Sequence, residues 1–450
     1  MTPAQMAAVD AAAPEPVDVL IERAGRAVAR TAIDMLGGCY GRRVVVIAGK
    51  GNNGNDGRAA AARLTRRGIR VEVVDANDPG SLPECDLVID AAYGTGFRGT
   101  WPAPDVGGTP VLAVDIPSGV DGLTGSALGP VLRAERTVTF AALKPGLLFE
   151  PGRHYAGDVE VADIGLPVPP VSTHLVEASD VRAWVPARAS DAHKWRAAVW
   201  IIGGSRGMVG AAHLAARGAQ RAGAGYVRLS VPAMSPDDAT PVEVVGLAIP
   251  AAPWSDAVLA GLERVHALVV GPGLGRADST GESVRALVRA AMLPMVIDGD
   301  GIVALAWSSE GANAVLRDRE APTVLTPHDG EFAILRGKRV GADRIAATRD
   351  LARDLHAVVL LKGPTTVVAG PDGQALVVTA GDERLATAGT GDVLSGVIGA
   401  LLARRVSALE AAAAGAWLHG RAARYGAPEG FLAGDLPELL PRAFADAVDR

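Results

Sequence analysis

Short apolar runs alternate with alanine-rich stretches of helical spacing along almost the whole chain. In the first 165 residues five of these runs are almost continuously apolar, which is typical of parallel strands covered by helices on both faces. A stretch with helical spacing, 56–67, separates the first two runs. The alternation predicts a doubly wound α/β sheet. Its predicted strands are 44–48, 71–75, 87–91, 111–115 and 137–140.

A proline-rich segment, Leu166-Pro167-Val168-Pro169-Pro170, interrupts this alternation. Proline favours extended backbone, so we expect a linker here, with the domain boundary between about residues 166 and 190. The predicted domains are therefore 1–170 and 178–450.

The alternation resumes after the linker and predicts a second, larger α/β domain. A helix is expected at 279–291, where Ser279 and Glu282 have the spacing of a capping box. Two successive helices, 391–404 and 408–424, are expected near the end of the chain. The predicted strands are 198–202, 226–231, 267–270, 295–298, 323–326 and 358–362.

The composition excludes several classes of protein. A net charge of −6 and a pI near 5.8 leave no basic surface of the kind that binds nucleic acid or an anionic membrane. No apolar stretch approaches the ~20 residues that a membrane-spanning helix requires, and no signal-peptide pattern opens the chain. The two cysteines, Cys39 and Cys85, lie in no zinc-binding pattern. We therefore expect a soluble, cytoplasmic protein without nucleic-acid or membrane partners.

Polar, glycine-rich turns follow three of the predicted strands in the first half. They read GKGNNGNDG at 49–57, DAAYGTGFRG at 90–99 and VDIPSGVDG at 114–122. In an open α/β sheet the carboxyl ends of the strands flank the ligand crevice, and a helix start offers free amide groups to an anion. Each turn alone is compatible with ordinary turn chemistry, in which Asn, Asp and Gly are frequent. Three such ends in one domain favour a shared ligand pocket.

These three motifs resemble the N-terminal domain of the YjeF family, epimerases that act on the hydrated nicotinamide nucleotides NADHX and NADPHX. The resemblance covers residues 1 to about 165 and implies a Rossmann-like domain. It implies that Asp115 contacts the substrate near its reacting carbon, and that either Asp115 or Asp56 transfers the proton. It also implies a potassium ion held by Asn53, Asp90 and Ser118. The substrate-binding residues that it implies are Asn52, Asn53, Gly54, Asn55, Asp56, Gly94, Thr95, Gly96, Phe97, Arg98, Gly99, Thr100 and Asp115.

A second candidate site begins at Gly389-Thr390-Gly391-Asp392, immediately before a long apolar stretch of helical spacing. Main-chain amides at a helix start bind phosphate oxygens, and Asp392 is placed there to deprotonate a hydroxyl during phosphoryl transfer. The alternative is that Asp392 only caps the helix and the glycines only serve the turn. Four further strand ends favour a nucleotide site. They are GGSRGMVGAA at 203–212, GPGLG at 271–275, LTPHDGE at 325–331 and LKGPTT at 361–366.

Together these turns resemble the ADP-dependent NAD(P)HX dehydratases, which have a ribokinase-like fold. The resemblance covers about residues 185–445. It implies that the C6 hydroxyl of the substrate is phosphorylated by ADP, with Mg²⁺ on the phosphates and Asp392 as base, before phosphate leaves. Nucleotide binding is implied for Lys362, Gly363, Pro364, Thr365, Thr366 and Gly391, and substrate binding for Ala211, Gly273, His328 and Asp392.

The chain is thus predicted to be a bifunctional repair enzyme that epimerises (R)-NAD(P)HX and dehydrates (S)-NAD(P)HX to NAD(P)H. ADP would be the co-substrate, and AMP and phosphate would be released. Assemblies are common in such families, so a homo-oligomer is expected. Two alternatives are a ribokinase-like kinase of small molecules, such as vitamin precursors, and a binding protein in which one site has decayed. A kinase would return a stable phosphorylated product from ATP.

Two positions depart from the usual family motifs. Asn55 replaces the second glycine of an NNGGDG loop, and asparagine tolerates left-handed backbone better than most residues do. Trp195 stands where a glycine usually follows His193-Lys194. We expect its ring to narrow the second site or to alter the mobility of that loop.

Overall fold

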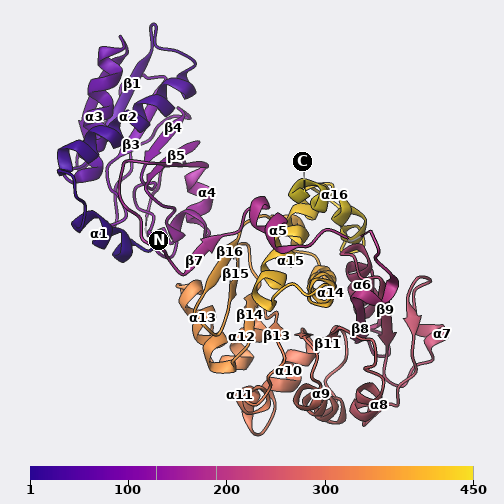
Figure 1. The fold of residues 1–450 in the computed structure, drawn as a ribbon. Coiled ribbons are helices and arrows are strands. Elements are labelled where there is room, and N and C mark those ends of the chain that lie inside the picture. The colour runs from indigo at the N-terminus through magenta and orange to yellow at the C-terminus, as the bar shows by residue number, and fades with distance from the viewer. Residues whose placement is uncertain (128, 189, 449–450) are drawn as a thin grey trace. The chain divides into compact units, whose positions relative to one another are not determined.

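The chain divides into two units, Met1–Val171 and Ser172–Arg450 (Figure 1). The computed structural model describes residues 1–127, 129–188 and 190–448. Within these residues, no helix combines the length and the apolar character that crossing a bilayer requires.

The first unit contains a six-stranded sheet in which every pair of neighbouring strands is parallel. The strand order β2-β1-β3-β4-β5-β6 reverses direction between β1 and β3, which is the doubly wound arrangement. The five predicted strands are confirmed to within one residue at each end. The strands are β1 (Arg43–Ala48), β2 (Arg70–Asp75), β3 (Leu87–Ala91), β4 (Val111–Val114), β5 (Arg136–Phe140) and β6 (Asp158–Ala162).

The helices of this unit are less well predicted. Helix α3 begins at Asn52, four residues before the predicted start, so the asparagines of the glycine-rich turn belong to its first turn. The pattern also missed β6 and the two helices before β1. The helices are α1 (Pro3–Ala11), α2 (Val17–Leu36), α3 (Asn52–Arg66) and α4 (Gly152–Ala156).

The second unit contains a ten-stranded sheet in the order β10-β9-β8-β11-β12-β13-β14-β15-β16-β7. All six predicted strands are present, and their pairings with one another are parallel. The antiparallel hairpin β15-β16 was not predicted. The strands are β7 (Thr173–Leu175), β8 (Ala198–Ile202), β9 (Tyr226–Ser230), β10 (Val245–Gly246), β11 (Ala267–Val270), β12 (Met295–Ile297), β13 (Thr323–Leu325), β14 (Val358–Leu361), β15 (Thr366–Ala369) and β16 (Ala375–Val378).

The proline-rich segment 166–170 forms no helix or strand, whereas β7 pairs with β16 and the following helix packs on α15 and α16. One prediction about this unit is wrong. Ser279 and Glu282 form no capping box, because α9 begins at Asp278 and its cap carries no side-chain hydrogen bond. The helices are α5 (Ala178–Trp184), α6 (Val209–Arg221), α7 (Pro236–Ala239), α8 (Ser255–Ala260), α9 (Asp278–Ala290), α10 (Asp300–Ala306), α11 (Gly311–Leu316), α12 (Asp329–Arg336), α13 (Arg344–Leu355), α14 (Thr390–Ala403), α15 (Ala408–Ala423) and α16 (Leu436–Val448).

Helix α14 is apolar on almost every side, because it lies between α6 and α15 and also contacts strands β8, β11 and β12. Neighbours on every side of a buried helix prevent it from shifting or rotating. Its amino end, where the Gly389–Asp392 turn lies, is therefore held at a fixed place against the sheet.

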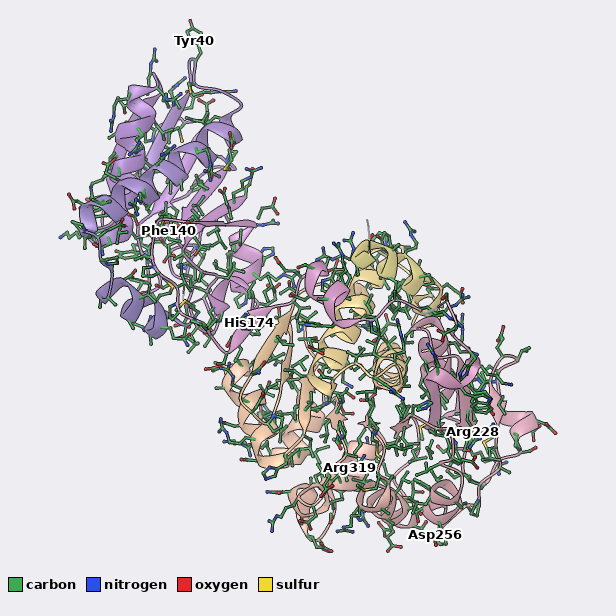
Figure 2. The ribbon with its side chains drawn as sticks, viewed as in Figure 1. Tyr40, Phe140, His174, Arg228, Asp256 and Arg319 are labelled. Carbon is green, nitrogen blue, oxygen red and sulfur yellow. The ribbon has the colours of Figure 1, made fainter. Side chains whose placement is uncertain are left out.

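The guanidinium of Arg319 closes the carboxyl end of α9 (Figure 2). It donates to the carbonyl of Val288 at 2.9 Å and also to those of Ala291 and Leu293, while its Nε donates to Thr323 Oγ1 at 2.7 Å. Burial lowers the pKa of Arg319 to about 10. A single side chain thus satisfies several carbonyls that the helix leaves without partners.

We expect Arg319→Met to lower the free energy of unfolding of the second unit by about 3 kcal/mol, since it leaves buried carbonyls unpaired. Six of the seven tryptophans lie in this unit, so fluorescence during urea unfolding reports it. Arg289→Met is the matched control, because the contact of Arg289 within the described residues is an exposed ion pair with Glu310. That control should cost less than about 1 kcal/mol. Equal losses in both variants would contradict this role of Arg319.

Candidate active sites

A cavity of about 910 Å³ opens at the carboxyl edge of the first sheet. Helices α1 and α2 supply its apolar wall, with Met6, Leu20 and Ile21 among the lining residues. The glycine-rich turns supply the polar wall. The predicted residues that line it are Asn52, Asn53, Asp56, Gly94, Thr95, Gly96, Phe97, Arg98 and Asp115, whereas Gly54, Asn55, Gly99 and Thr100 lie outside the lining.

The turn after β1 presents the start of α3 to this cavity. Gly54 has no room for a side chain, because a Cβ there would lie 1.9 Å from the carbonyl oxygen of Gly49. Asn55 lies in the first helical turn, where it does not take up left-handed backbone, and its amide donates to Gly51 at 3.1 Å. The change from glycine to Asn55 therefore needs no special backbone tolerance.

An ion pair between Asp115 and the buried Lys144 lines the cavity. Asp115 follows β4 in a left-handed conformation (φ +67°), and its Oδ1 is 2.7 Å from Lys144 Nζ. The Lys144 side chain is only 2% exposed and also donates to Thr139 Oγ1 at 2.8 Å and to the carbonyl of Phe140 at 2.9 Å. The amide of Thr95 approaches Asp115 Oδ2 at 3.4 Å. The lysine therefore fixes the orientation of the Asp115 carboxyl beside the cavity.

Asp56 has the opposite environment. Its side chain is buried in α3, and among the described residues no hydrogen bond or ion pair to its carboxyl is found. Burial raises its pKa to about 8, and the nearby carboxylates of Asp115 and Asp10 add to the shift. At neutral pH Asp56 is therefore protonated.

A third group of polar side chains joins the ends of β3 and β4. Ser118 donates to Asp90 through its amide at 2.8 Å and through its hydroxyl at 2.6 Å, and the amide of Tyr93 donates to Ser118 Oγ at 2.8 Å. Despite these bonds, burial raises the pKa of Asp90. Asn53, whose Cβ lies close to Gly94, has a side-chain amide that is buried without a hydrogen-bond partner.

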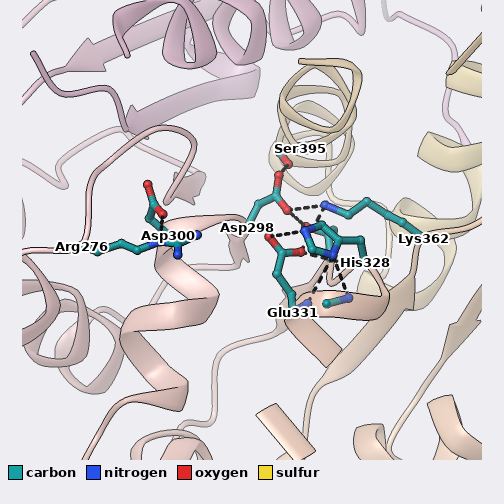
Figure 3. A network of polar contacts seen from close by, with 9 residues as sticks. Arg276, Asp298, Asp300, His328, Glu331, Lys362 and Ser395 are labelled. Atoms are coloured by element: carbon teal, nitrogen blue, oxygen red, sulfur yellow. Dashed lines mark hydrogen bonds and ion pairs between the residues drawn. The ribbon is translucent and has the colours of Figure 1, made fainter. Parts of the chain in front are cut away.

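The carboxyl edge of the second sheet carries a network centred on Asp298 (Figure 3). Asp298 follows β12, and its Oδ1 is 2.9 Å from Lys362 Nζ, which follows β14. Its Oδ2 accepts from Ser395 Oγ on α14 at 2.6 Å. Lys362 Nζ also lies 3.6 Å from Glu331 Oε2.

Asp392 lies in the first turn of α14, next to this network. Burial raises its pKa to about 7, and the charge of Asp298 adds to the shift while Lys362 opposes it. A Cβ at Gly391 would be 3.4 Å from Lys362 Nζ, so the lysine faces the helix start. The imidazole of His419, on α15, contacts the carbonyl of Thr390 at 2.9 Å and braces the same turn.

The other predicted residues lie on the neighbouring strand ends. The turns after β8 and β11 touch, since a Cβ at Gly273 would be 2.9 Å from that of Ala211. His328 caps α12, where its Nδ1 accepts from the amide of Gly330 at 2.9 Å. Gly363, Pro364, Thr365 and Thr366 connect β14 to β15, and Arg344 bonds the carbonyl of Lys362 at 2.9 Å.

Trp195 does not lie where the sequence suggested. Its ring stacks on Tyr226, the first residue of β9, with centroids 4.2 Å apart, and Arg264 lies over it just before β11. These contacts place the ring at the amino ends of the strands, opposite the edge that carries Asp298 and Lys362. The expected narrowing of the site by Trp195 is therefore wrong, because the loop before β8 packs at the amino edge of the sheet.

Sequence reasoning missed Lys144 and Asp298 as site residues. Lys144 follows the predicted strand 137–140, and Asp298 was taken as the last residue of a predicted strand. Both carried the usable signal of a charged side chain at the end of an apolar run. Neither lies within the turns that the sequence analysis singled out, although Asp298 begins the stretch Asp298-Gly299-Asp300-Gly301.

Comparisons with known proteins agree with this division. Residues 199–444 match a family model described as NAD(P)H-hydrate dehydratase. Residues 17–83 and 74–146 match one described as YjeF-related protein N-terminus. A bifunctional NAD(P)H-hydrate repair enzyme of Moorella thermoacetica is 36% identical, with 95% of this chain and 92% of that protein covered. The corresponding enzyme of Salinibacter ruber is 38% identical, with 96% and 92% covered.

Solved structures resemble the second unit. The ADP/ATP-dependent NAD(P)H-hydrate dehydratase of Bacillus subtilis, co-crystallised with ATP and Mg²⁺, has a TM-score of 0.53 and 31% identity. The match covers 61% of this chain and 98% of that one. A ribokinase-like protein of Enterococcus faecalis, 20% identical with a TM-score of 0.54, shares the fold, as predicted.

Proposed function

Because the chain belongs to the family of bifunctional NAD(P)H-hydrate repair enzymes, we propose that its two sites carry out successive steps of one repair. The cavity of the first unit epimerises (R)-NAD(P)HX. The crevice of the second unit dehydrates (S)-NAD(P)HX to NAD(P)H and uses ADP. The observation that carries this assignment is a pair of chemically different groups in each site. The first cavity holds the protonated Asp56 and the lysine-paired Asp115, and the second unit holds Asp392 beside Lys362.

The first cavity divides acid and base between Asp56 and Asp115. Neutral Asp56 donates a proton to the C6 hydroxyl, which leaves as water while the N1 lone pair forms an iminium. Water then adds to the opposite face of C6, and Asp115, which pairs with Lys144, accepts the released proton. Around the reacting ring, Asn52 and the loop from Gly94 to Arg98 bind the remainder of the dinucleotide.

A potassium ion fits the group formed by Asn53, Asp90 and Ser118. The unpaired amide oxygen of Asn53 and the buried carboxylate of Asp90 are oxygen donors with capacity for a hard cation. When bound, such an ion supplies positive charge beside the substrate-binding loop. These residues hold the loop after β3 in place through the bonds from Ser118 to Tyr93.

The protonation of Asp56 predicts how epimerisation depends on pH. An acid with a pKa of about 8 is active below that value, so the rate should fall as the pH rises through about 8. Asp56→Asn cannot donate a proton and should lower the rate about 100-fold while removing this alkaline limb. The measurement is the interconversion of NADHX epimers by chromatography between pH 6 and 10. A wild-type rate that is constant from pH 7 to 9 would contradict the assignment.

In the second unit, Asp392 removes the proton of the C6 hydroxyl, and that oxygen attacks the terminal phosphorus of ADP to release AMP. Phosphate then leaves C6, and loss of a C5 proton restores the double bond of the dihydronicotinamide. Lys362 and the amides at the start of α14, including that of Gly391, bind the phosphates. Gly363 to Thr366 border the same nucleotide site, and Ala211, Gly273 and His328 contact the hydrated dinucleotide.

Magnesium fits this site as a companion of the nucleotide. Among the described residues no group of three His, Cys, Asp or Glu side chains is arranged to hold a metal. Mg²⁺ is commonly bound through substrate phosphates. The site has three carboxylates, Asp298, Glu331 and Asp392, but one lysine, Lys362, beside them. This negative charge would repel bare phosphates, so the site favours a nucleotide whose phosphates already carry a cation.

The compartment and the assembly are part of the proposal. Cys39 and Cys85 are free thiols, which suits the reducing cytoplasm where nicotinamide nucleotides turn over. We also propose that the chain forms a homo-oligomer, which sedimentation of the purified protein tests directly.

One experiment tests the assigned reactions together. The protein is incubated with mixed NADHX epimers and either ADP or ATP, and reduced nicotinamide and phosphate are followed at the same time. Equal yields of NADH and phosphate, with both epimers consumed, are the expected result. A stable phosphorylated product would instead identify a kinase, and no turnover would indicate a decayed site.

A further inference from the structure

Asp298 makes three hydrogen bonds at the second site, although neither proton transfer nor phosphate binding as assigned above uses it. Its side chain is 3% exposed. Oδ1 accepts from Lys362 Nζ at 2.9 Å and from Thr326 Oγ1 at 2.7 Å, and Oδ2 accepts from Ser395 Oγ at 2.6 Å (Figure 3). A buried carboxylate with this many donors is held rigidly in its ionised form.

The three donors come from different parts of the unit. Thr326 follows β13, Lys362 follows β14, and Ser395 lies on α14, one turn beyond Gly391. Ser395 Oγ is also 3.0 Å from the carbonyl of Gly391. One carboxylate therefore connects the lysine to the helix start that faces it.

We propose that Asp298 is the positioning residue that holds the ammonium of Lys362 at the start of α14, next to Gly391, so that it does not pair with the catalytic carboxylate Asp392. The inference rests on the proposed dehydratase function of the second unit. A lysine side chain is long and flexible, so its ammonium needs a fixed partner to stay at one place. Asp298 supplies that partner, and Ser395 ties the partner to α14.

Other carboxylates would compete for the lysine if Asp298 lost its charge. Glu331 Oε2 is already 3.6 Å away, and Asp392 also faces Lys362. Although burial lowers the pKa of Lys362, the carboxylates of Asp298 and Glu331 outweigh it and raise that pKa. Without the charge of Asp298, the lysine would turn toward Asp392 and stabilise its ionised form.

The role of Asp298 should therefore be visible in the pKa of Asp392. The charged or titratable groups that face it are Asp298 after β12, Asp300 on α10, Glu331 on α12 and Lys362 after β14, and His419 lies behind its turn on α15. Burial and the Asp298 charge raise the pKa of Asp392, whereas Lys362 lowers it. Neutralising Asp298 removes a negative charge that raises the pKa of Asp392. It also releases Lys362, whose positive charge lowers that pKa, so both changes lower the pKa of Asp392.

The test is Asp298→Asn in the full chain, assayed with purified (S)-NADHX, ADP and Mg²⁺. Asparagine keeps the size of the side chain and its hydrogen-bonding capacity but removes the charge. We expect the plateau kcat to fall about tenfold, because a weaker base transfers protons more slowly. The acid limb of the pH profile should move to lower pH by about one unit. The KM for (S)-NADHX should change less than about twofold.

A double-mutant cycle with Lys362→Met distinguishes positioning from a general structural effect. If Asp298 acts through the lysine, the further loss in kcat from Asp298→Asn in the Lys362→Met background should be clearly smaller than the tenfold loss in the wild type, about threefold or less. The part that remains is the direct effect of the Asp298 charge on Asp392. Multiplicative losses, or an Asp298→Asn enzyme with the wild-type kcat and pH profile, would overturn the proposal. If Asp298→Asn shows no cooperative thermal unfolding, Ser395→Ala takes its place. It should lower kcat about threefold alone and not further beside Lys362→Met, and a multiplicative loss there would again overturn the proposal.

Failure of the positioning role of Asp298 can be distinguished from failure of the proposed dehydratase function. A wild-type protein that forms no NADH from (S)-NADHX and ADP contradicts the dehydratase assignment. A working wild-type enzyme whose Asp298→Asn variant is unchanged contradicts only the positioning role.

Discussion

Asp392→Asn is expected to stop the ADP-driven recovery of NADH from (S)-NADHX, with a fall in kcat of at least about 1000-fold. The amide cannot accept the proton of the C6 hydroxyl, and no other carboxylate lies at the start of α14. Epimerisation should continue at the wild-type rate, because the first cavity is built entirely from residues of the other unit. The measurement is reduced-nicotinamide absorbance, with epimer ratios followed by chromatography.

The pH profile and a control variant sharpen this prediction. A base whose pKa is raised to about 7 is active when ionised, so wild-type dehydration should fall as the pH drops through about 7. Glu410→Gln is the matched control, since Glu410 is a carboxylate in the first turn of α15 that bonds only Ser407. It should dehydrate at nearly the wild-type rate. Full dehydratase activity in Asp392→Asn would refute the assignment of the base.

Lys144→Met should abolish epimerisation, with a loss of at least about 100-fold, and leave dehydration of purified (S)-NADHX intact. The substitution removes the cation that lies 2.7 Å from Asp115. Asp115 then loses the cation that orients its carboxylate and favours the charged form, which makes it a poorer base. The assay begins with purified (R)-NADHX and adds ADP, so that NADH appears only after epimerisation.

Two variants distinguish the ion pair from a general need for positive charge in the cavity. Lys50→Met removes another lysine of the lining, which is exposed, and should cost less than about tenfold. Lys144→Arg keeps the charge but not the fit around Thr139 and Phe140, so we expect partial activity. Equal losses in Lys50→Met and Lys144→Met would rule out the specific role of the buried pair.

Local patterns in the sequence were sufficient to predict most of the strands and the polar turns that follow them. Near-continuous apolar runs identified all the central strands of both sheets, because parallel strands buried on both faces need such runs. The glycine-rich turns after β1, β3 and β4 lie at one edge of the first sheet, since parallel strands place their carboxyl ends together. The resemblance to known families also came from these turns.

Elements without such a pattern were missed. The hairpin β15-β16 consists of two four-residue strands, and a short apolar run does not show which partner it pairs with. Asn52 was read as part of a loop, although the first turn of a helix tolerates asparagine well. The position of Trp195 followed from stacking on Tyr226, a contact that no local pattern contains.

Apolar runs and polar, glycine-rich strand ends were enough to predict the two α/β units, the candidate sites and the family. How the charges are paired could be seen only in the folded chain. Asp298 and Lys362 are 64 residues apart and meet because β12 and β14 both end at the same edge of the sheet. The Asp115–Lys144 pair and the unpaired Asp56 depend on burial as well. Protonation states follow from which charges lie close together and from how far water is excluded, and both are properties of the folded chain.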